Sequence, residues 1–139
     1  MTLPTAAHRR HVLTAPTLPA TVTLARRTGE QTWTAWGVAP THLALGQALL
    51  ILTELVTNSV RHAAPASPSL DVIYAHADGV LAFGVHDRHP FLPRFTPTTD
   101  RAARGLDLIA ELVNELGGTH IARPDIDERG KTIWITLPM

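Results

Sequence analysis

The stretch Glu54-Leu55-Val56-Thr57-Asn58-Ser59-Val60-Arg61-His62-Ala63 lies near the end of a long run of apolar residues. Glu54 and Asn58 are four residues apart, so on an α-helix they share a face. Because a helix turns by about 100° per residue, Gln47, Glu54, Asn58 and Arg61 fall within a sector of roughly 60°. The stretch therefore predicts a helix that presents a carboxylate, an amide and a guanidinium together, and such a set can hold a cation and a phosphate.

The predicted helix, from about Pro40 to His62, is apolar on most of its circumference. A helix that is apolar nearly all round is usually buried, which favours a polar row that points into protein or a cavity. The alternative is a solvated polar stripe near a helix end. Asn favours the first interpretation slightly, because it is a weak helix former whose side chain competes for backbone hydrogen bonds. The apolar residues beside and opposite the polar row are Leu45, Leu49, Leu50, Ile51, Leu52 and Val56.

The composition indicates one globular domain. The chain has 139 residues, 45% of them hydrophobic, no cysteine and a formal net charge of zero. This length suffices for one core, and the neutral balance favours neither a nucleic acid nor an anionic membrane as partner. No uninterrupted apolar run approaches the roughly 20 residues that span a bilayer, and no signal-type apolar core follows the first residues. Since the lack of cysteine fits a reducing compartment, we expect residues 1–7 to be a flexible terminus and residues 8–139 to be a single cytoplasmic domain.

Periodicity and turn residues predict the order strand, helix, helix, hairpin, long loop, helix, hairpin. Asp78-Gly79 between two short apolar runs is a strong hairpin signal, and Thr17 is expected to cap the first helix. Hairpins imply a mixed, mostly antiparallel sheet with helices on one face, which is an α+β two-layer sandwich. The expected strands are 8–14, 70–75, 80–86, 119–122 and 131–137, and the expected helices are 19–36, 40–62 and 105–116.

Two further places can carry chemistry. Asp87 ends a strand, where a carboxylate can accept a hydrogen bond from a ligand amine, although Asp is also a common turn residue. Residues 87–104 are rich in proline and lack periodicity, and so long an irregular segment in a compact domain is often a lid. This segment leads into Arg104-Gly105-Leu106, where a helix N-terminus can bind phosphate through its N–H groups, with Arg101 adding positive charge.

Two other patterns are less informative. Gly130-Lys131-Thr132 imitates the end of a P-loop, but Asp125 occupies the position of the first glycine and a strand follows, which excludes a Walker A site. His86 and His89 are three residues apart, but no third ligand lies nearby at a spacing familiar from zinc sites. A histidine-based metallohydrolase is therefore the weakest interpretation.

Together these motifs resemble those of the GHKL (Bergerat-fold) histidine-kinase-like ATPase domain, and especially those of short anti-sigma-factor serine kinases and actinobacterial ATP-binding regulatory proteins. Glu54-Leu55-Val56-x-Asn58-x-x-x-His62-Ala63 resembles the family's N box. Val85-His86-Asp87-x-x-Pro90 resembles the G1 region, and Arg104-Gly105-Leu106-x-Leu108-Ile109 is similar to the G2 region that closes the lid. Gly130-Lys131-Thr132-Ile133-Trp134 resembles the final core strand, so the resemblance spans about residues 8–139.

The resemblance implies a role for each matching residue. Glu54 would be the general base that activates a serine hydroxyl on a partner protein. Asn58 would coordinate the Mg²⁺ that bridges the phosphates of ATP, and Asp87 would accept a hydrogen bond from the adenine amine. The other residues implied in ATP binding would lie at the phosphates, at the lid or beside the adenine, and they are Arg61, His62, Arg104, Gly105, Leu106 and Thr132.

The resemblance also implies partners. The chain would bind a sigma factor, would phosphorylate an anti-anti-sigma partner of the STAS type on serine, and would form a homodimer. Two positions depart from the family pattern, since His89 and Ala103 stand where glycines are common in the G1 and G2 regions, and glycine is the more permissive residue. These departures leave open an alternative, which is a degenerate GHKL-fold protein-interaction module with little or no nucleotide binding or kinase activity.

Overall fold

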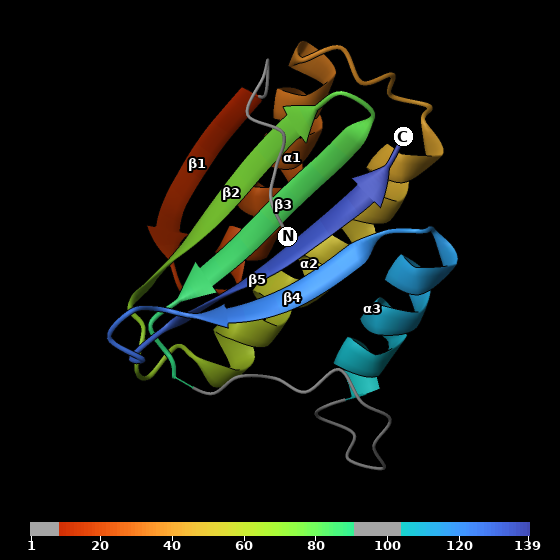
Figure 1. Ribbon diagram of the computed structural model, residues 1–139. Coiled ribbons are helices and arrows are strands. Elements are labelled where there is room, and N and C mark those ends of the chain that lie inside the picture. The colour runs from red at the N-terminus through yellow and green to blue at the C-terminus, as the bar shows by residue number, and fades with distance from the viewer. Residues whose placement is uncertain (1–8, 91–103) are drawn as a thin grey trace.

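The computed structural model describes residues 9–90 and 104–139, which form a twisted sheet with helices packed on one face (Figure 1). The elements follow the predicted order, and the predicted α+β two-layer sandwich is confirmed. The strands are β1 (Arg9–Pro16), β2 (Ser69–Ala77), β3 (Val80–Asp87), β4 (Thr119–Pro124) and β5 (Lys131–Pro138), and the helices are α1 (Ala20–Ala35), α2 (Leu43–His62) and α3 (Arg104–Glu115).

The five described strands lie in the order β1-β2-β3-β5-β4. Each of the four strand pairs is antiparallel, so the sheet contains no parallel pair within the described residues. The neighbouring strands β3 and β5 are not consecutive in the chain, and their register sets Asp87 opposite Lys131 and His86 opposite Thr132. Because side chains alternate along a strand, these two pairs lie on opposite faces of the sheet.

The hairpin predicted at Asp78-Gly79 joins β2 to β3. Ala77 pairs with Val80, which leaves Asp78 and Gly79 as the two residues of the turn. Gly79 has a φ of 69°, a left-handed conformation that glycine adopts without steric cost. This tight turn fixes the register of β2 and β3, and therefore the place where β3 ends at Asp87.

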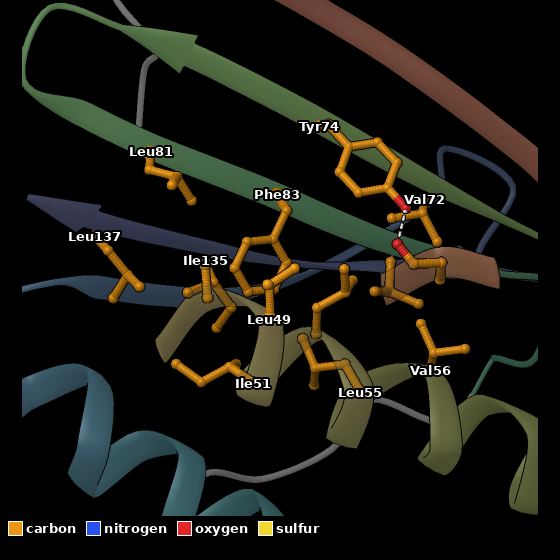
Figure 2. Packing of buried hydrophobic residues seen from close by; sticks show 14 of the residues in the cluster. Leu49, Ile51, Leu55, Val56, Val72, Tyr74, Leu81, Phe83, Ile135 and Leu137 are labelled. Carbon is orange, nitrogen blue, oxygen red and sulfur yellow. Dashed lines mark hydrogen bonds between the residues drawn. The ribbon is translucent and has the colours of Figure 1, made fainter. Parts of the chain in front are cut away.

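The hydrophobic core lies between α2 and the sheet (Figure 2). Two large aromatic residues in this layer have satisfied polar groups, since the Tyr74 hydroxyl donates to the carbonyl of Ala25 at 2.6 Å and Trp33 Nε1 donates to the carbonyl of Ala75 at 3.1 Å. Burial of each large apolar side chain stabilises the fold by about 1.5–3 kcal/mol. The core residues labelled in Figure 2 are Leu49, Ile51, Leu55, Val56, Val72, Tyr74, Leu81, Phe83, Ile135 and Leu137.

Helix α2 is less completely buried than its composition predicted. Nine of its 20 residues are buried, whereas Leu50 is 53% exposed. By length and mean hydropathy Leu43–His62 could cross a membrane, although no uninterrupted apolar run in the sequence predicted such a segment, and half of it is buried inside the protein. His42 Nδ1 caps its start by accepting from the Ala44 N–H at 3.0 Å.

The predicted cap of α1 is wrong. Pro19 occupies the N-cap position, and no side chain caps the helix there. Thr17 instead donates through Oγ1 to the carbonyl of Ser67 at 2.6 Å, which ties the start of α1 to the loop after α2. The expected flexible terminus, residues 1–7, and most of the expected lid, residues 91–103, lie outside the described residues.

Candidate functional site

Asp87 is the centre of the candidate site. It is the last residue of β3, its side chain points toward the helices, and the residue is only 3% exposed. Ser59 of α2 donates through Oγ to Asp87 Oδ2 at 2.8 Å, and Lys131 Nζ lies 2.6 Å from Asp87 Oδ1. The backbone N–H of His89 donates to the same Oδ1 at 3.1 Å. A buried carboxylate requires such partners, and here they come from α2, from β5 and from the chain just after β3.

Gly130 allows the turn between β4 and β5 to lie against the end of β3. A Cβ atom at position 130 would lie 2.6 Å from the carbonyl oxygen of Asp87 and would also meet the carboxylate of Asp125. Real Cβ atoms do not approach backbone oxygens so closely, so only glycine fits without displacing one of the strands. This close approach brings Lys131 to the Asp87 carboxylate.

The polar row of α2 extends from the site toward solvent. Glu54 is exposed and Asn58 is half-buried, so Glu54 does not point into the protein interior as its apolar neighbours suggested. Within residues 9–90 and 104–139 neither side chain forms a hydrogen bond. Arg61 and His62 are exposed in the last turn of the same helix. The end of α2 therefore offers an amide, a carboxylate and two basic groups beside the buried Asp87–Ser59 contact.

The first turn of α3 lies at the same end of the molecule. Figure 1 shows the end of β3 and the C-terminal end of α2 at the lower left of the view, and the start of α3 in the lower right part of the same view. Arg104, Gly105 and Leu106 are the first three residues of α3, so their backbone N–H groups belong to a helix N-terminus as predicted. Ala103 and Arg101 lie outside the described residues.

The position expected for Thr132 is corrected by the register of β5. Thr132 pairs with His86 and therefore lies on the face of the sheet away from Asp87. Lys131, one residue earlier, is the residue of β5 that contacts Asp87. The motif therefore indicated the strand that contacts Asp87, but Thr132 lies on its opposite face, because neighbouring residues of a strand point to opposite sides.

A second polar cluster lies on the other face of the sheet, behind Asp87. His86 Nε2 lies 2.9 Å from Asp125 Oδ2, and its Nδ1 lies 3.1 Å from Asp71 Oδ2. Burial alone would lower the pKa of His86, but the hydrogen bonds to Asp125 and Asp71 outweigh this effect and raise the pKa above its usual range. Arg88 forms ion pairs with Asp125 at 2.6 Å and with Asp127 at 2.7 Å, and it lowers the pKa of Asp127 to about 2.

This cluster is held together by hydrogen bonds and ion pairs. In the described part of the chain, no group of three His, Cys, Asp or Glu side chains could hold a metal ion. Both ring nitrogens of His86 are within hydrogen-bond distance of carboxylates. The cluster therefore ties β3 to β2 and to the β4–β5 turn.

Comparison with known families identifies the family to which the chain belongs. The family model of the histidine kinase-like ATPase domain matches residues 15–137, which include every side chain of the candidate site described above. The chain belongs to this family. This kind of domain implies ATP binding together with Mg²⁺ in general.

Among solved structures, this histidine kinase-like ATPase domain is similar to the histidine kinase domain from the Erythrobacter litoralis EL346 blue-light activated histidine kinase. The TM-score is 0.49 and the sequence identity is 20%. The similarity covers 68% of this chain and 44% of that chain, so this chain matches less than half of the solved domain. Comparison with curated proteins gives no match.

In this histidine kinase-like ATPase domain, His89 causes no backbone strain. In the described ranges Glu128 is the only non-glycine residue with a positive φ. His89 therefore has a negative φ, which any residue other than proline adopts without strain. Its N–H donates to Asp87, and its carbonyl accepts from Lys131 Nζ at 3.2 Å. Glycine is therefore not required at position 89 by the backbone conformation.

Two residues of the site were not identified from the sequence. Ser59 belongs to the buried stripe of α2, where a small hydroxyl residue is easily taken for a packing residue. Lys131 was noticed only as part of a rejected P-loop pattern and of the motif for the final core strand, without a role of its own, although it is the only lysine in the chain and begins an apolar strand. A charged residue at the edge of an apolar run was the signal that could have identified it, because buried lysines are rarely unpaired.

Proposed function

We propose that this chain is an ATP- and Mg²⁺-binding regulatory protein of the anti-sigma-factor serine kinase type. The observation that carries the proposal is the contact between Ser59 and Asp87, which joins the motif of α2 to a buried carboxylate at the end of β3. Membership in the histidine kinase-like ATPase family supports the proposal that the chain binds ATP. The sigma factor, the STAS-type partner, the homodimer and the cytoplasmic location follow from the resemblance of the motifs.

The residues present fit Mg²⁺ and ATP. The amide oxygen of the half-buried Asn58 is the kind of hard oxygen ligand that Mg²⁺ accepts. The Oδ2 atom of Asp87 accepts one hydrogen bond, from Ser59, and a carboxylate oxygen can accept a second from an amine. The N-terminus of α3 at Gly105 and the basic side chains of Arg61 and His62 suit a polyphosphate. Bound ATP would supply the phosphoryl group for transfer.

Glu54 suits a general base for a macromolecular substrate. Its side chain is exposed, so a serine on a partner protein can reach it without opening the core. Glu54 lies one helical turn before Asn58, on the same face of α2. The carboxylate would take the proton of the serine hydroxyl, while Asn58 would position the metal.

The role of Asn58 is tested by the Mg²⁺ dependence of ATP binding. Asn58→Ala should weaken ATP binding measured by calorimetry at least about tenfold when Mg²⁺ is present. Without Mg²⁺ the variant and the parent should bind ATP alike, because the amide acts through the metal. Asn114→Ala, which removes an exposed amide on α3, is the matched control and should bind as the parent does. Equal Mg²⁺ dependence in Asn58→Ala and the parent would contradict the assignment.

The role of Glu54 is tested by transfer of labelled phosphate from ATP to a serine of an anti-anti-sigma protein. Glu54→Ala should lower the transfer rate by a factor of about 10²–10⁴ and should leave ATP affinity nearly unchanged. Glu111→Ala, on an exposed face of α3, should transfer phosphate at the parental rate. If Glu54→Ala also transfers phosphate normally, the kinase mechanism is wrong.

The second candidate function is a protein-interaction module with the same fold. It is favoured by one observation, which is that the donors on Asp87 already come from the protein itself. In that case ATP with Mg²⁺ would produce neither heat in calorimetry nor a shift in the thermal unfolding midpoint. A measurable Kd for ATP would exclude this candidate.

A further inference from the structure

Lys131 stands out because it is the only lysine in the sequence and is buried. Lys131 is 8% exposed, and its Nζ donates to Asp87 Oδ1 at 2.6 Å and to the carbonyl of His89 at 3.2 Å. A buried lysine is normally paired, and the short distance to Asp87 shows a close ion pair. The ammonium therefore neutralises the one carboxylate that the site offers to a ligand amine.

The hydrogen-bond capacity of Asp87 is nearly used up within the protein. A carboxylate offers about four acceptor positions. Oδ1 accepts from Lys131 Nζ and from the His89 N–H, and Oδ2 accepts from Ser59 Oγ. One position remains on Oδ2, on a residue that is 3% exposed. An incoming amine therefore meets a carboxylate that is already paired and nearly covered.

We propose that Lys131 competes with the amino group of the nucleotide base for Asp87, and so sets the affinity and selectivity of the site for bases that carry an exocyclic amine. This inference rests on the proposed function, in which Asp87 accepts from that amine. The amine of the base would take the remaining position on Oδ2, and the ammonium on Oδ1 would weaken that hydrogen bond because it neutralises the charge of the carboxylate. The ammonium of Lys131 is thus a cation of the protein itself that competes with the base for Asp87.

The proposal predicts a gain of affinity from a loss of charge. Lys131→Met keeps an unbranched side chain of similar length and removes the ammonium. Because a hydrogen bond to a charged group is worth a factor of about ten or more in an equilibrium constant, the variant should bind ATP about tenfold more tightly in calorimetry with Mg²⁺. The unpaired carboxylate should also lower the thermal midpoint of the ligand-free variant, and ATP should raise that midpoint more than it does in the parent.

Two controls separate competition from a merely structural role. Purine riboside triphosphate lacks the exocyclic amine, so its affinity should be the same in Lys131→Met and in the parent. Arg88→Met removes the neighbouring cation, which pairs with Asp125 and Asp127 on the other face of the sheet. It should leave ATP affinity unchanged. The parent also allows a measurement without a variant, because ¹⁵N-labelled lysine gives one side-chain ammonium signal, which ATP should shift more than purine riboside triphosphate does.

The outcomes distinguish this inference from the proposed function. If the parent binds ATP and Lys131→Met binds it no more tightly, the competition is refuted and the proposed function stands. An equal gain for ATP and for purine riboside triphosphate also refutes it, as does an ammonium signal that responds equally to both. If neither protein binds ATP, both proposals fail. Binding by Lys131→Met but not by the parent would show that Lys131 blocks the site.

Discussion

At Asp87, donors from three parts of the chain meet on one carboxylate. Ser59 lies 28 residues before it and Lys131 lies 44 residues after it. The sequence identified Asp87, because a carboxylate at the end of a strand and before a proline-rich segment is readable as a pattern. The partners were not readable, because the β3–β5 register brings Lys131 to Asp87 and the motif alone pointed to Thr132.

Gly130 provides a stability test at the residue scale. Gly130→Ala should lower the free energy of unfolding by about 1–3 kcal/mol, because its Cβ would press against the backbone at Asp87. Gly46→Ala is the matched control, since Gly46 lies in α2 and a methyl group there would have no neighbouring atom within 4 Å, and it should raise stability by about 0.5–1 kcal/mol. Urea denaturation of both variants measures the difference. Similar effects of both substitutions would show that the close approach at Gly130 is unimportant.

The end of β3 is the element on which the site depends. His86, Asp87 and Arg88 are consecutive, and each is bonded to the β4–β5 turn or to the start of β5. The sequence predicted the bounds of β3 closely, since its apolar run begins at the Asp78-Gly79 turn and stops at the first charged residues. It did not predict the cross-strand contacts, because β4 and β5 join the sheet from a distant part of the chain.

The cluster around His86 makes stability depend on pH. The raised pKa of His86 means that the folded state holds its proton more tightly than the unfolded state. This contribution is fully present below about pH 6.5, the usual value for histidine, and is lost as the pH rises through the higher pKa of the folded state. The free energy of unfolding of the parent, measured by urea denaturation, should therefore fall over this range.

His86→Gln should remove that pH dependence. The groups that face His86 are Asp71 on β2 and Asp125 on the β4–β5 turn, with Arg88 bonded to Asp125. Gln can keep one hydrogen bond but carries no titrating charge. The variant should therefore lose less stability than the parent between about pH 6 and pH 8. If both proteins lose the same amount, the stabilisation does not come from the histidine.

At the scale of the whole molecule, the elements that carry the motifs have their relevant ends on the same side of the molecule. The end of β3, the last turns of α2 and the first turn of α3 all lie in the lower part of Figure 1, with α3 to the right of the other two. The order of elements and the two-layer architecture were predictable because turn residues and periodicities are local signals. The exposure of Glu54 was not predictable in this way. The apolar composition of α2 indicated burial nearly all round, whereas only nine of its 20 residues are buried.

The most direct measurement of the central claim is a calorimetric comparison of ATP and GTP binding to the parent protein with Mg²⁺. If Asp87 accepts a hydrogen bond from the base, ATP should bind with one site per chain. GTP should bind at least about tenfold more weakly, because its carbonyl oxygen at the corresponding ring position would face the carboxylate. Absence of ATP binding, or equal affinity for ATP and GTP, would contradict the claim that this end of β3 recognises the base of a nucleotide.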